Sequence, residues 1–207
     1  MKVKFVLGIS GASGISLALG FLAVLKDLGQ NLELFVVLSN GAKQCAKSEL
    51  NLEDLKHKIL DITTNARSHS QSSGIQTQMQ TQIYEDFEMD APIAAGSCGA
   101  DMMAVIPTSM DCLAKIACGI SDTLLTRTAQ VMIKEGKKLL LAPREMPLSA
   151  IACNNMTTLA NLGVIIAPPI LGYYAKPSNL VEMEHFIFGK WLDSLGISNS
   201  LYHRWGE

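Results

Sequence analysis

An arginine and a glutamate stand side by side in the segment Pro143-Arg144-Glu145-Met146-Pro147, directly after the apolar run 139–142. A strand that carries two opposite charges at its carboxyl end and then stops at a proline places polar chemistry at the rim of a sheet, where open α/β folds bind ligands. A guanidinium can hold a phosphate, and a carboxylate can move protons. An exposed ion pair that merely ends a strand would leave the same pattern, so the other strand ends must decide between the two interpretations.

Polar residues also follow the other predicted strands. The first strand runs into the glycine-rich turn 8–14, which opens into a helix and would let backbone N–H groups approach an anion. That turn lacks the GxGxxG spacing of a dinucleotide fingerprint, so a tight turn that only serves the fold explains it equally well. The later strands are followed by Ser39-Asn40, by Thr108-Ser109-Met110 and, beyond two prolines, by Tyr173-Tyr174. Each serine alone is best explained as a helix cap, but five polar strand ends at one rim predict a binding crevice.

Five apolar runs of strand length alternate with stretches of helical periodicity, which is typical of a parallel sheet with crossover helices. The runs lie at about 3–9, 32–38, 102–107, 138–142 and 163–167. One predicted helix spans 15–28 and ends at Gly29, and another runs from Ser121-Asp122 to about Lys134, with an acid in its first turn. We therefore expect an α/β fold, with a three-layer αβα, Rossmann-like (flavodoxin-like) parallel sheet and crossover helices.

The length of 207 residues, 48% of them hydrophobic, fits one domain over 1–207 with a buried core. A polar segment at about 63–90 interrupts the alternation of apolar runs and helical stretches. It has five glutamines between Gln71 and Gln82 and an acidic run at 85–88. We expect an excursion from the sheet there. A short hairpin, a flap and a plain solvated loop all fit this composition.

Charge and cysteine content exclude several classes of function. A formal net charge of −2 provides no bulk field for nucleic acid or an acidic membrane, so neither is expected as a partner. The five cysteines are odd in number and lack CxxC spacing, which favours free thiols in a reducing compartment over disulfides or a metal site. The apolar run near the amino terminus is too short for a signal peptide or a membrane span. We therefore expect a cytoplasmic protein without a bound metal.

Two cations lie on the predicted helix that ends near residue 134. Arg127 and Lys134 are seven residues apart and share nearly one helix face, and together with Arg144 they could clamp a phosphate. A solvated face shared with the charged residues that follow explains Lys134 equally well.

Five motifs lie in order along the chain: Gly11-Ala12-Ser13-Gly14, the run 116–122 with Arg127 beyond it, the run 143–149, Asn155-Met156, and Arg204-Trp205-Gly206. Together they resemble the flavin prenyltransferases, a family of FMN-binding flavoproteins. That family builds the prenylated FMN used by partner decarboxylases in ubiquinone biosynthesis and aromatic acid metabolism. The likeness covers about residues 3–206, and the Pro-Arg-Glu-x-Pro segment is its most specific part.

The resemblance implies an enzyme that joins the dimethylallyl group of dimethylallyl monophosphate to N5 and C6 of reduced FMN, without a metal. The residues that would contact FMN by position are Gly11, Ala12, Ser13, Ser39, Ser97, Ser109, Met110 and Arg127. Those that would hold the prenyl phosphate are Glu49, Lys134, Arg144, Tyr174 and Lys190. Glu145 matches the acid that moves protons near the flavin, with Ser13 and Glu49 as further catalytic candidates. These residue types suit the chemistry, because a phosphate leaving group needs cations and donors that neutralise its charge.

Two positions depart from the family pattern. Lys190 stands where many relatives carry an arginine, so the positive charge is kept but the bidentate fork is lost. Met89, just before Asp90-Ala91-Pro92, stands where some relatives carry a tryptophan. Methionine can still pack against a prenyl group there.

Two other functions remain open. An FMN-dependent cysteine decarboxylase of related fold would need a histidine base and an Asn-x-x-Met clamp, whereas Asn154 and Asn155 precede Met156 too closely. We expect the histidines to lie away from the rim; they are His57, His69, His185 and His203. A non-catalytic flavin-binding or storage protein would leave Lys134, Arg144 and Glu145 without a purpose. The family also implies a dodecamer with flavin sites near subunit junctions, and the aromatic tail 202–205 fits buried subunit contacts.

Overall fold

The computed structural model describes residues 2–28, 32–64 and 79–206. Within these residues a parallel sheet has the strand order β3-β2-β1-β4-β5-β6. The strands are β1 (Val3–Ile9), β2 (Leu32–Leu38), β3 (Gln80–Glu85), β4 (Met102–Thr108), β5 (Lys138–Pro143) and β6 (Ile165–Ile166). The order reverses between β1 and β4, as it does in doubly wound Rossmann folds, and a ligand crevice is expected at that point.

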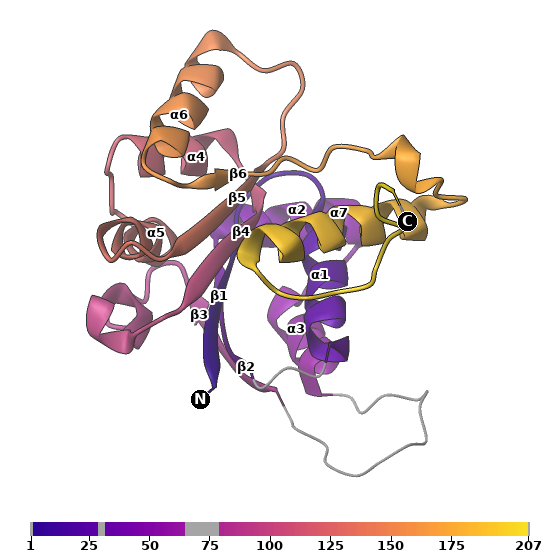
Figure 1. Ribbon diagram of the computed structural model, residues 1–207. Coiled ribbons are helices and arrows are strands. Elements are labelled where there is room, and N and C mark those ends of the chain that lie inside the picture. Colours follow the sequence, from indigo (N-terminus) through magenta and orange to yellow (C-terminus); the bar gives the residue numbers. More distant parts are fainter. Residues whose placement is uncertain (1, 29–31, 65–78, 207) are drawn as a thin grey trace.

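Helices cover both faces of the sheet, so the molecule has three layers (Figure 1). One face carries α1 (Ile15–Asp27), α2 (Asn40–Leu50), α3 (Leu55–Thr64) and α7 (Leu180–Leu195). The other carries α4 (Met110–Ala117), α5 (Leu124–Lys134) and α6 (Ala150–Asn161). Short 3-10 helices lie in the connections: η1 (Pro92–Ala94), η2 (Gly96–Cys98) and η3 (Tyr173–Ala175). The predicted three-layer αβα fold is confirmed.

Side chains of alternate residues in the central strands pack into two separate hydrophobic cores, one on each face of the sheet. In β1, Phe5 and Leu7 pack on the side of α1 and α7, whereas Val6 packs on the side of α4 and α5. Because both faces of β1 are covered, its sequence is a nearly continuous apolar run. Trp191 of α7 is buried in the first core, and its indole N–H donates to the carbonyl of Ala167 at 2.8 Å. That bond fastens α7 to the chain just beyond β6.

The structure adds a strand that the sequence did not predict. β3 lies within the segment 63–90, which was expected to leave the sheet, yet residues 80–85 pair in parallel with β2 at the edge. An edge strand has only one neighbouring strand and is half exposed, so it tolerates polar residues. Because β3 is polar, it does not form an apolar run that would predict a strand. The rest of the glutamine-rich part, 65–78, lies outside the described residues, as does Gly29, the predicted end of α1.

The predicted start of α5, with Ser121 as the cap and Asp122 in the first turn, was wrong by two residues. The helix begins at Leu124 because Thr123 caps it: Thr123 Oγ1 accepts the N–H of Thr126 at 3.3 Å, and Thr126 Oγ1 accepts the N–H of Thr123 at 3.2 Å. Its first turn therefore contains no acid. Asp122 instead pairs with Lys115 of α4, with 3.1 Å between Nζ and Oδ2.

The remaining strand predictions hold at β1, β2, β4 and β5, while the fifth predicted run shrinks to the two residues of β6. Among the described helices, none is both long and apolar enough to cross a membrane.

Candidate functional site

A cavity of about 600 Å³ opens at the carboxyl ends of β1, β2 and β4, where the strand order reverses. Three helices begin at its wall, α2 after Ser39, α4 after Ser109 and α5 after Thr123. The N-termini of α2 and α4 carry partial positive charge, so the cavity suits an anionic or strongly polar ligand. At the start of α5 the N–H groups already have partners, among them Asp86. Four predicted FMN contacts, Gly11, Ser39, Ser109 and Met110, line it.

The two serines of this cavity are helix caps as well. Ser39 Oγ accepts the N–H of Ala42 at 3.1 Å, and Ser109 Oγ accepts the N–H of Cys112 at 3.2 Å. A hydroxyl that accepts from the backbone still has its own proton to donate. Capping and ligand contact are therefore compatible roles for the same side chain.

The glycine-rich turn after β1 packs directly against the start of α2. A Cβ added to Gly11 would lie 2.8 Å from the Cα of Gly41, so no side chain fits between the two backbones. The next residue, Ala12, is buried. The turn thus presents backbone to the cavity, which allows close approach of a ligand.

The first helix begins without a side-chain cap of its own, because Gly14 occupies the cap position with a φ of 101°. Glu49 of α2 supplies the missing acceptor: its Oε2 accepts the N–H of Gly14 at 2.9 Å and that of the following residue at 3.3 Å. The carboxylate therefore occupies the anion position at this helix end. Ser13, a predicted catalytic residue, is exposed beside it.

Sequence reasoning missed Ser10, which is 2% exposed. Its Oγ donates to the carbonyl of Pro107 at 2.8 Å and accepts the N–H of Ser109 at 2.7 Å. It therefore joins the end of β1 to the start of α4 across the switch in strand order. A polar residue placed directly between an apolar strand and a glycine turn was the signal that could have singled it out.

Asp86 was also missed, because the sequence showed it only as part of an acidic run. Its Oδ1 accepts the N–H of Leu125 at 2.8 Å, and its carbonyl accepts that of Leu124 at 2.7 Å. Burial raises the pKa of this carboxyl group, although the hydrogen bonds from Leu125 and the Thr123 side chain oppose the rise. Asp86 fastens the start of α5 to the end of β3 and forms part of the cavity wall.

A second cavity, of about 500 Å³, is lined by residues of the segment 89–98 and by Arg127 of α5. Ser97 and Arg127, both predicted FMN contacts, line it together with Met89. The Nε of Arg127 donates to the carbonyl of Ala94 at 2.9 Å, which holds η1 against α5. The neighbouring Thr126 lines the first cavity, so a single turn of α5 contributes side chains to both cavities.

The Arg144-Glu145 pair lies at the rim, as predicted. The backbone N–H of Arg144 donates to the carbonyl of Thr108 at 3.1 Å, which sets the pair beside the start of α4. Both side chains are exposed, and Glu145 Oε1 accepts the N–H of Met146 at 2.9 Å. Within the described residues no ion pair joins Arg144 to Glu145, so the alternative of a simple strand-end ion pair does not hold.

Two predicted phosphate ligands come from the carboxyl-terminal part of the chain. Tyr174 lies in η3, where its ring contacts Phe186 edge-on at 5.3 Å and Trp205 at 5.5 Å between centroids. Lys190 lies on α7 and is exposed.

Lys134 lies apart from these residues. It is the last residue of α5, where it pairs with Glu135 beside Gly96. α5 ends where β5 begins, whereas Arg144 follows the end of β5, so the length of the strand, about 15–20 Å, separates the two cations. A single chain therefore does not form the predicted clamp of Arg127, Lys134 and Arg144.

The side chains that metal sites and histidine bases require are spread out. Among the described residues no group of three or more His, Cys, Asp or Glu could hold a metal ion, and all five cysteines are free thiols. His57 pairs with Asp61 on α3, His185 lies on α7, and His203 lies in the tail, whereas His69 falls outside the described residues. None of the described histidines lines either cavity.

Comparison with known proteins finds a matching family model and relatives that align over nearly the whole chain. Residues 1–188 match the family model described as Flavoprotein. The flavin prenyltransferase UbiX of Helicobacter pylori (strain J99) is 46% identical over 204 residues, which are 99% of each chain.

Solved structures align over the full length as well. A dodecameric FMN-dependent UbiX-like decarboxylase from Escherichia coli O157:H7 is 31% identical with a TM-score of 0.84, over 99% of this chain and 100% of that one. AnUbiX (PadA1), solved in complex with FMN and dimethylallyl pyrophosphate, is 29% identical with a TM-score of 0.85, over 100% and 99% of the two chains. Two FMN-dependent cysteine decarboxylases align at only 17% and 19% identity, and that likeness concerns the fold alone.

Proposed function

The chain belongs to the flavin prenyltransferases, within the wider Flavoprotein family, and we propose that it carries out their reaction. In this proposal it joins the dimethylallyl group of dimethylallyl monophosphate to N5 and C6 of reduced FMN. The family membership predicted from the sequence motifs is confirmed. The observation that carries the proposal is the full-length likeness to an enzyme of that name, combined with a cavity at the switch in strand order.

The main cavity fits FMN by volume and by its donors. The N-termini of α2 and α4 and the hydroxyls of Ser39 and Ser109 suit a phosphate or the polar ribityl chain. Met110 adds apolar contact, and Arg127 with Ser97 would hold the part of FMN that reaches the second cavity. When bound and reduced, FMN supplies the two ring atoms that accept the prenyl group.

The donor phosphate would be held by residues of the rim. Arg144, Tyr174 and Lys190 offer a guanidinium, a hydroxyl and an ammonium, which would neutralise the charge that develops on the departing phosphate.

Glu145 is the residue to which we assign proton transfer near the flavin. A carboxylate placed beside a bound ring can accept a proton and return it. Ser13 would relay such a proton, and Glu49, fixed on the N–H of Gly14, would orient the turn that carries Ser13.

The protein would work as an oligomer, which we propose to be a dodecamer. The carboxyl-terminal part of the chain, from residue 146 onward, exposes several large apolar side chains, as surfaces that pack against other copies do. Examples are Met146 (89% exposed), Ile151 (74%), Ile170 (69%), Tyr173 (75%), Leu180 (71%) and Trp205 (83%). Packing of copies would bury these side chains and desolvate Glu145. It would also let Lys134 of one copy reach the phosphate held at Arg144 of another.

The product, prenylated FMN, would pass to a partner decarboxylase, and we place the reaction in the cytoplasm. Five free thiols support a reducing compartment.

The test is anaerobic incubation of the full chain with reduced FMN and dimethylallyl monophosphate, followed by mass spectrometry of the flavin. We expect a flavin heavier by one five-carbon unit. If FMN is recovered unchanged, the prenyltransferase proposal fails.

An FMN-dependent decarboxylase of the cysteine decarboxylase type is the alternative. It would release carbon dioxide from a peptide with a carboxyl-terminal cysteine in the presence of oxidised FMN. It lacks support from the site, because Asn154, Asn155 and Met156 lie on α6 and line neither cavity.

A further inference from the structure

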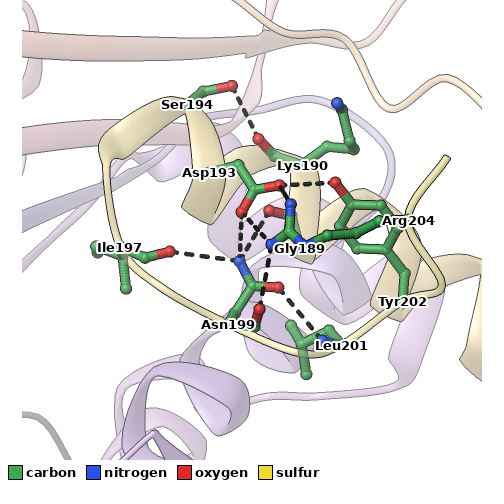
Figure 2. Close-up of polar contacts among 9 residues, drawn as sticks. All are labelled: Gly189, Lys190, Asp193, Ser194, Ile197, Asn199, Leu201, Tyr202 and Arg204. Atoms are coloured by element: carbon green, nitrogen blue, oxygen red, sulfur yellow. Dashed lines mark hydrogen bonds and ion pairs between the residues drawn. The ribbon is translucent and has the colours of Figure 1, made fainter. Parts of the chain in front are cut away.

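The carboxyl-terminal tail is fastened to α7 through one carboxylate, that of Asp193 (Figure 2). Arg204 binds it in a bidentate manner, with Nη1 at 2.9 Å from Oδ2 and Nη2 at 2.9 Å from Oδ1. The hydroxyl of Tyr202 donates to Oδ2 at 2.6 Å, and the side-chain amide of Asn199 donates to Oδ1 at 2.8 Å. We call these four residues the latch. Four charge-assisted hydrogen bonds at one carboxylate exceed what a surface ion pair needs.

Aromatic rings connect the latch to Tyr174. The ring of Tyr202 meets Phe186 of α7 edge-on at 5.1 Å between centroids, and Phe186 meets Tyr174 at 5.3 Å. Trp205, the residue after the latch arginine, contacts Tyr174 at 5.5 Å. The tail therefore touches Tyr174 directly through Trp205 and indirectly through Tyr202 and Phe186. Edge-to-face pairs of this kind fix ring orientation as well as add attraction.

The rings of Phe186 and Tyr202 each pack directly against a glycine, with no space for a side chain there. A Cβ at Gly172 would lie 2.0 Å from the ring of Phe186, and one at Gly189 would lie 2.4 Å from the ring of Tyr202. The loop that carries Tyr174 and the helix that carries Lys190 are thus both in close contact with the rings held by the latch. In Figure 2 the amine of Lys190 points away from Asp193, so this lysine is not a member of the latch.

The ionisation states agree with a permanent latch. Burial acts to raise the pKa of Asp193, but the hydrogen bonds from Arg204 and Tyr202 and the charge of Arg204 outweigh it and hold the pKa below its ordinary value. Burial and the bond to Asp193 raise the pKa of Tyr202 to about 12. At neutral pH the carboxylate is charged and the phenol keeps its proton.

We propose that Asp193 is a positioning residue for the prenyl donor: through Arg204 and Tyr202 it holds the tail so that Trp205 and Phe186 fix the Tyr174 hydroxyl toward the donor phosphate. The proposal rests on the proposed function, because Tyr174 is assigned there to the phosphate. Asp193 itself touches no substrate. Its effect is on the order of the segment 172–176, which lies at the rim between β6 and α7.

The experiment compares Asp193→Asn and Trp205→Ala with the unchanged chain, with Glu184→Gln as a matched control on the same helix outside the latch. Trp205 is 83% exposed, so its removal leaves the core intact even if Asp193→Asn weakens the fold. For each protein we would measure donor KM and kcat, calorimetric binding of dimethylallyl monophosphate, FMN affinity, near-ultraviolet circular dichroism and sedimentation.

Both latch variants should weaken donor binding by about tenfold and lower kcat as well, because Tyr174 is assigned to the departing phosphate, while FMN affinity stays nearly unchanged. Their near-ultraviolet aromatic signal should fall, and the double variant should be no worse than either single one, since both act on Tyr174. Glu184→Gln should match the unchanged chain. Equal donor binding in all variants would overturn the proposal, and so would an effect that appears only together with loss of the oligomer.

Failure of the positioning proposal can be distinguished from failure of the proposed function. If the unchanged chain makes no prenylated flavin, the function fails by itself. The near-ultraviolet signal of Asp193→Asn still decides the positional claim in that case, because a signal equal to that of the unchanged chain means that Asp193 does not hold the Tyr174 ring.

Discussion

The hydroxyl of Ser10 accepts the backbone N–H of Ser109 at 2.7 Å and so joins two segments that lie 99 residues apart in sequence. The bond spans the point where the strand order reverses, between the end of β1 and the first turn of α4. One buried hydroxyl therefore sets the distance between the glycine turn and the helix whose N-terminus faces the cavity.

Replacing Ser10 with alanine should lower the free energy of unfolding by about 1–3 kcal/mol, because the Pro107 carbonyl and the Ser109 N–H lose a buried partner. FMN affinity should fall as well, since α4 is no longer tied to β1. Urea denaturation and flavin fluorescence titration measure the two effects. Ser198→Ala, an exposed serine near the tail, is the control and should change neither.

Glu145→Gln should reduce turnover by about 100-fold or more while FMN still binds, because the amide keeps the shape but cannot carry the proton. Single-turnover kinetics with reduced FMN would measure the rate of prenyl transfer. Full activity in this variant would remove Glu145 from the mechanism. Glu53→Gln changes an exposed acid paired with Lys47 and should leave turnover unaltered.

Lys190→Arg should lower the KM for dimethylallyl monophosphate several-fold, because a guanidinium can hold two phosphate oxygens where an ammonium acts as a point charge. Steady-state kinetics would show the gain. Lys137→Arg, on the exposed turn before β5, is the matched control. An unchanged or higher KM in Lys190→Arg would mean that this residue does not meet the phosphate.

Subunit complementation should follow from the separation of Lys134 and Arg144. If the two cations at one phosphate come from different copies, Lys134→Ala and Arg144→Ala chains should each be inactive alone. Co-expressed in equal amounts, they should regain about a quarter of the sites by random pairing. Activity of purified mixed oligomers measures this, and no recovery would place both cations in one subunit or remove one from the site.

The latch should stabilise the fold only over a middle range of pH. The pKa of Asp193 is lower in the folded chain, so its contribution is complete above the ordinary aspartate value of about 3.9 and is lost as pH falls through the lower folded value. The pKa of Tyr202 is raised to about 12, so its contribution is complete below about 10 and is lost as pH rises through that folded value. The stability difference between the unchanged chain and Asp193→Asn, measured by urea denaturation, should shrink at both ends. A difference independent of pH would contradict the assignment.

Much of the fold could be predicted because its central strands are covered on both faces. Such strands must be apolar throughout, as in Val3–Ile9 and Leu32–Leu38, and the residues at their carboxyl ends then share one rim. β3 escaped prediction because an edge strand tolerates polar residues. The cap at Thr123 was missed because several residues near it could cap a helix equally well, and only the reciprocal bonds with Thr126 decide.

The sequence by itself determined the three-layer class, the family, and the set of side chains delivered to the rim, because these depend on local patterns and short motifs. Only the tertiary structure decided which of them meet. It brought Gly11, Ser39 and Ser109 to one cavity and left Lys134 at the end of the sheet where β5 begins. It also showed that Ser10 joins β1 to α4, that Asp86 holds the start of α5, and that Asp193 fastens the tail to α7. Ser10 and Asp86 act through hydrogen bonds to backbone groups of segments distant in sequence. Asp193 binds side chains 6 to 11 residues further along the chain. Neither kind of partner leaves a periodicity or a motif that a single sequence can show.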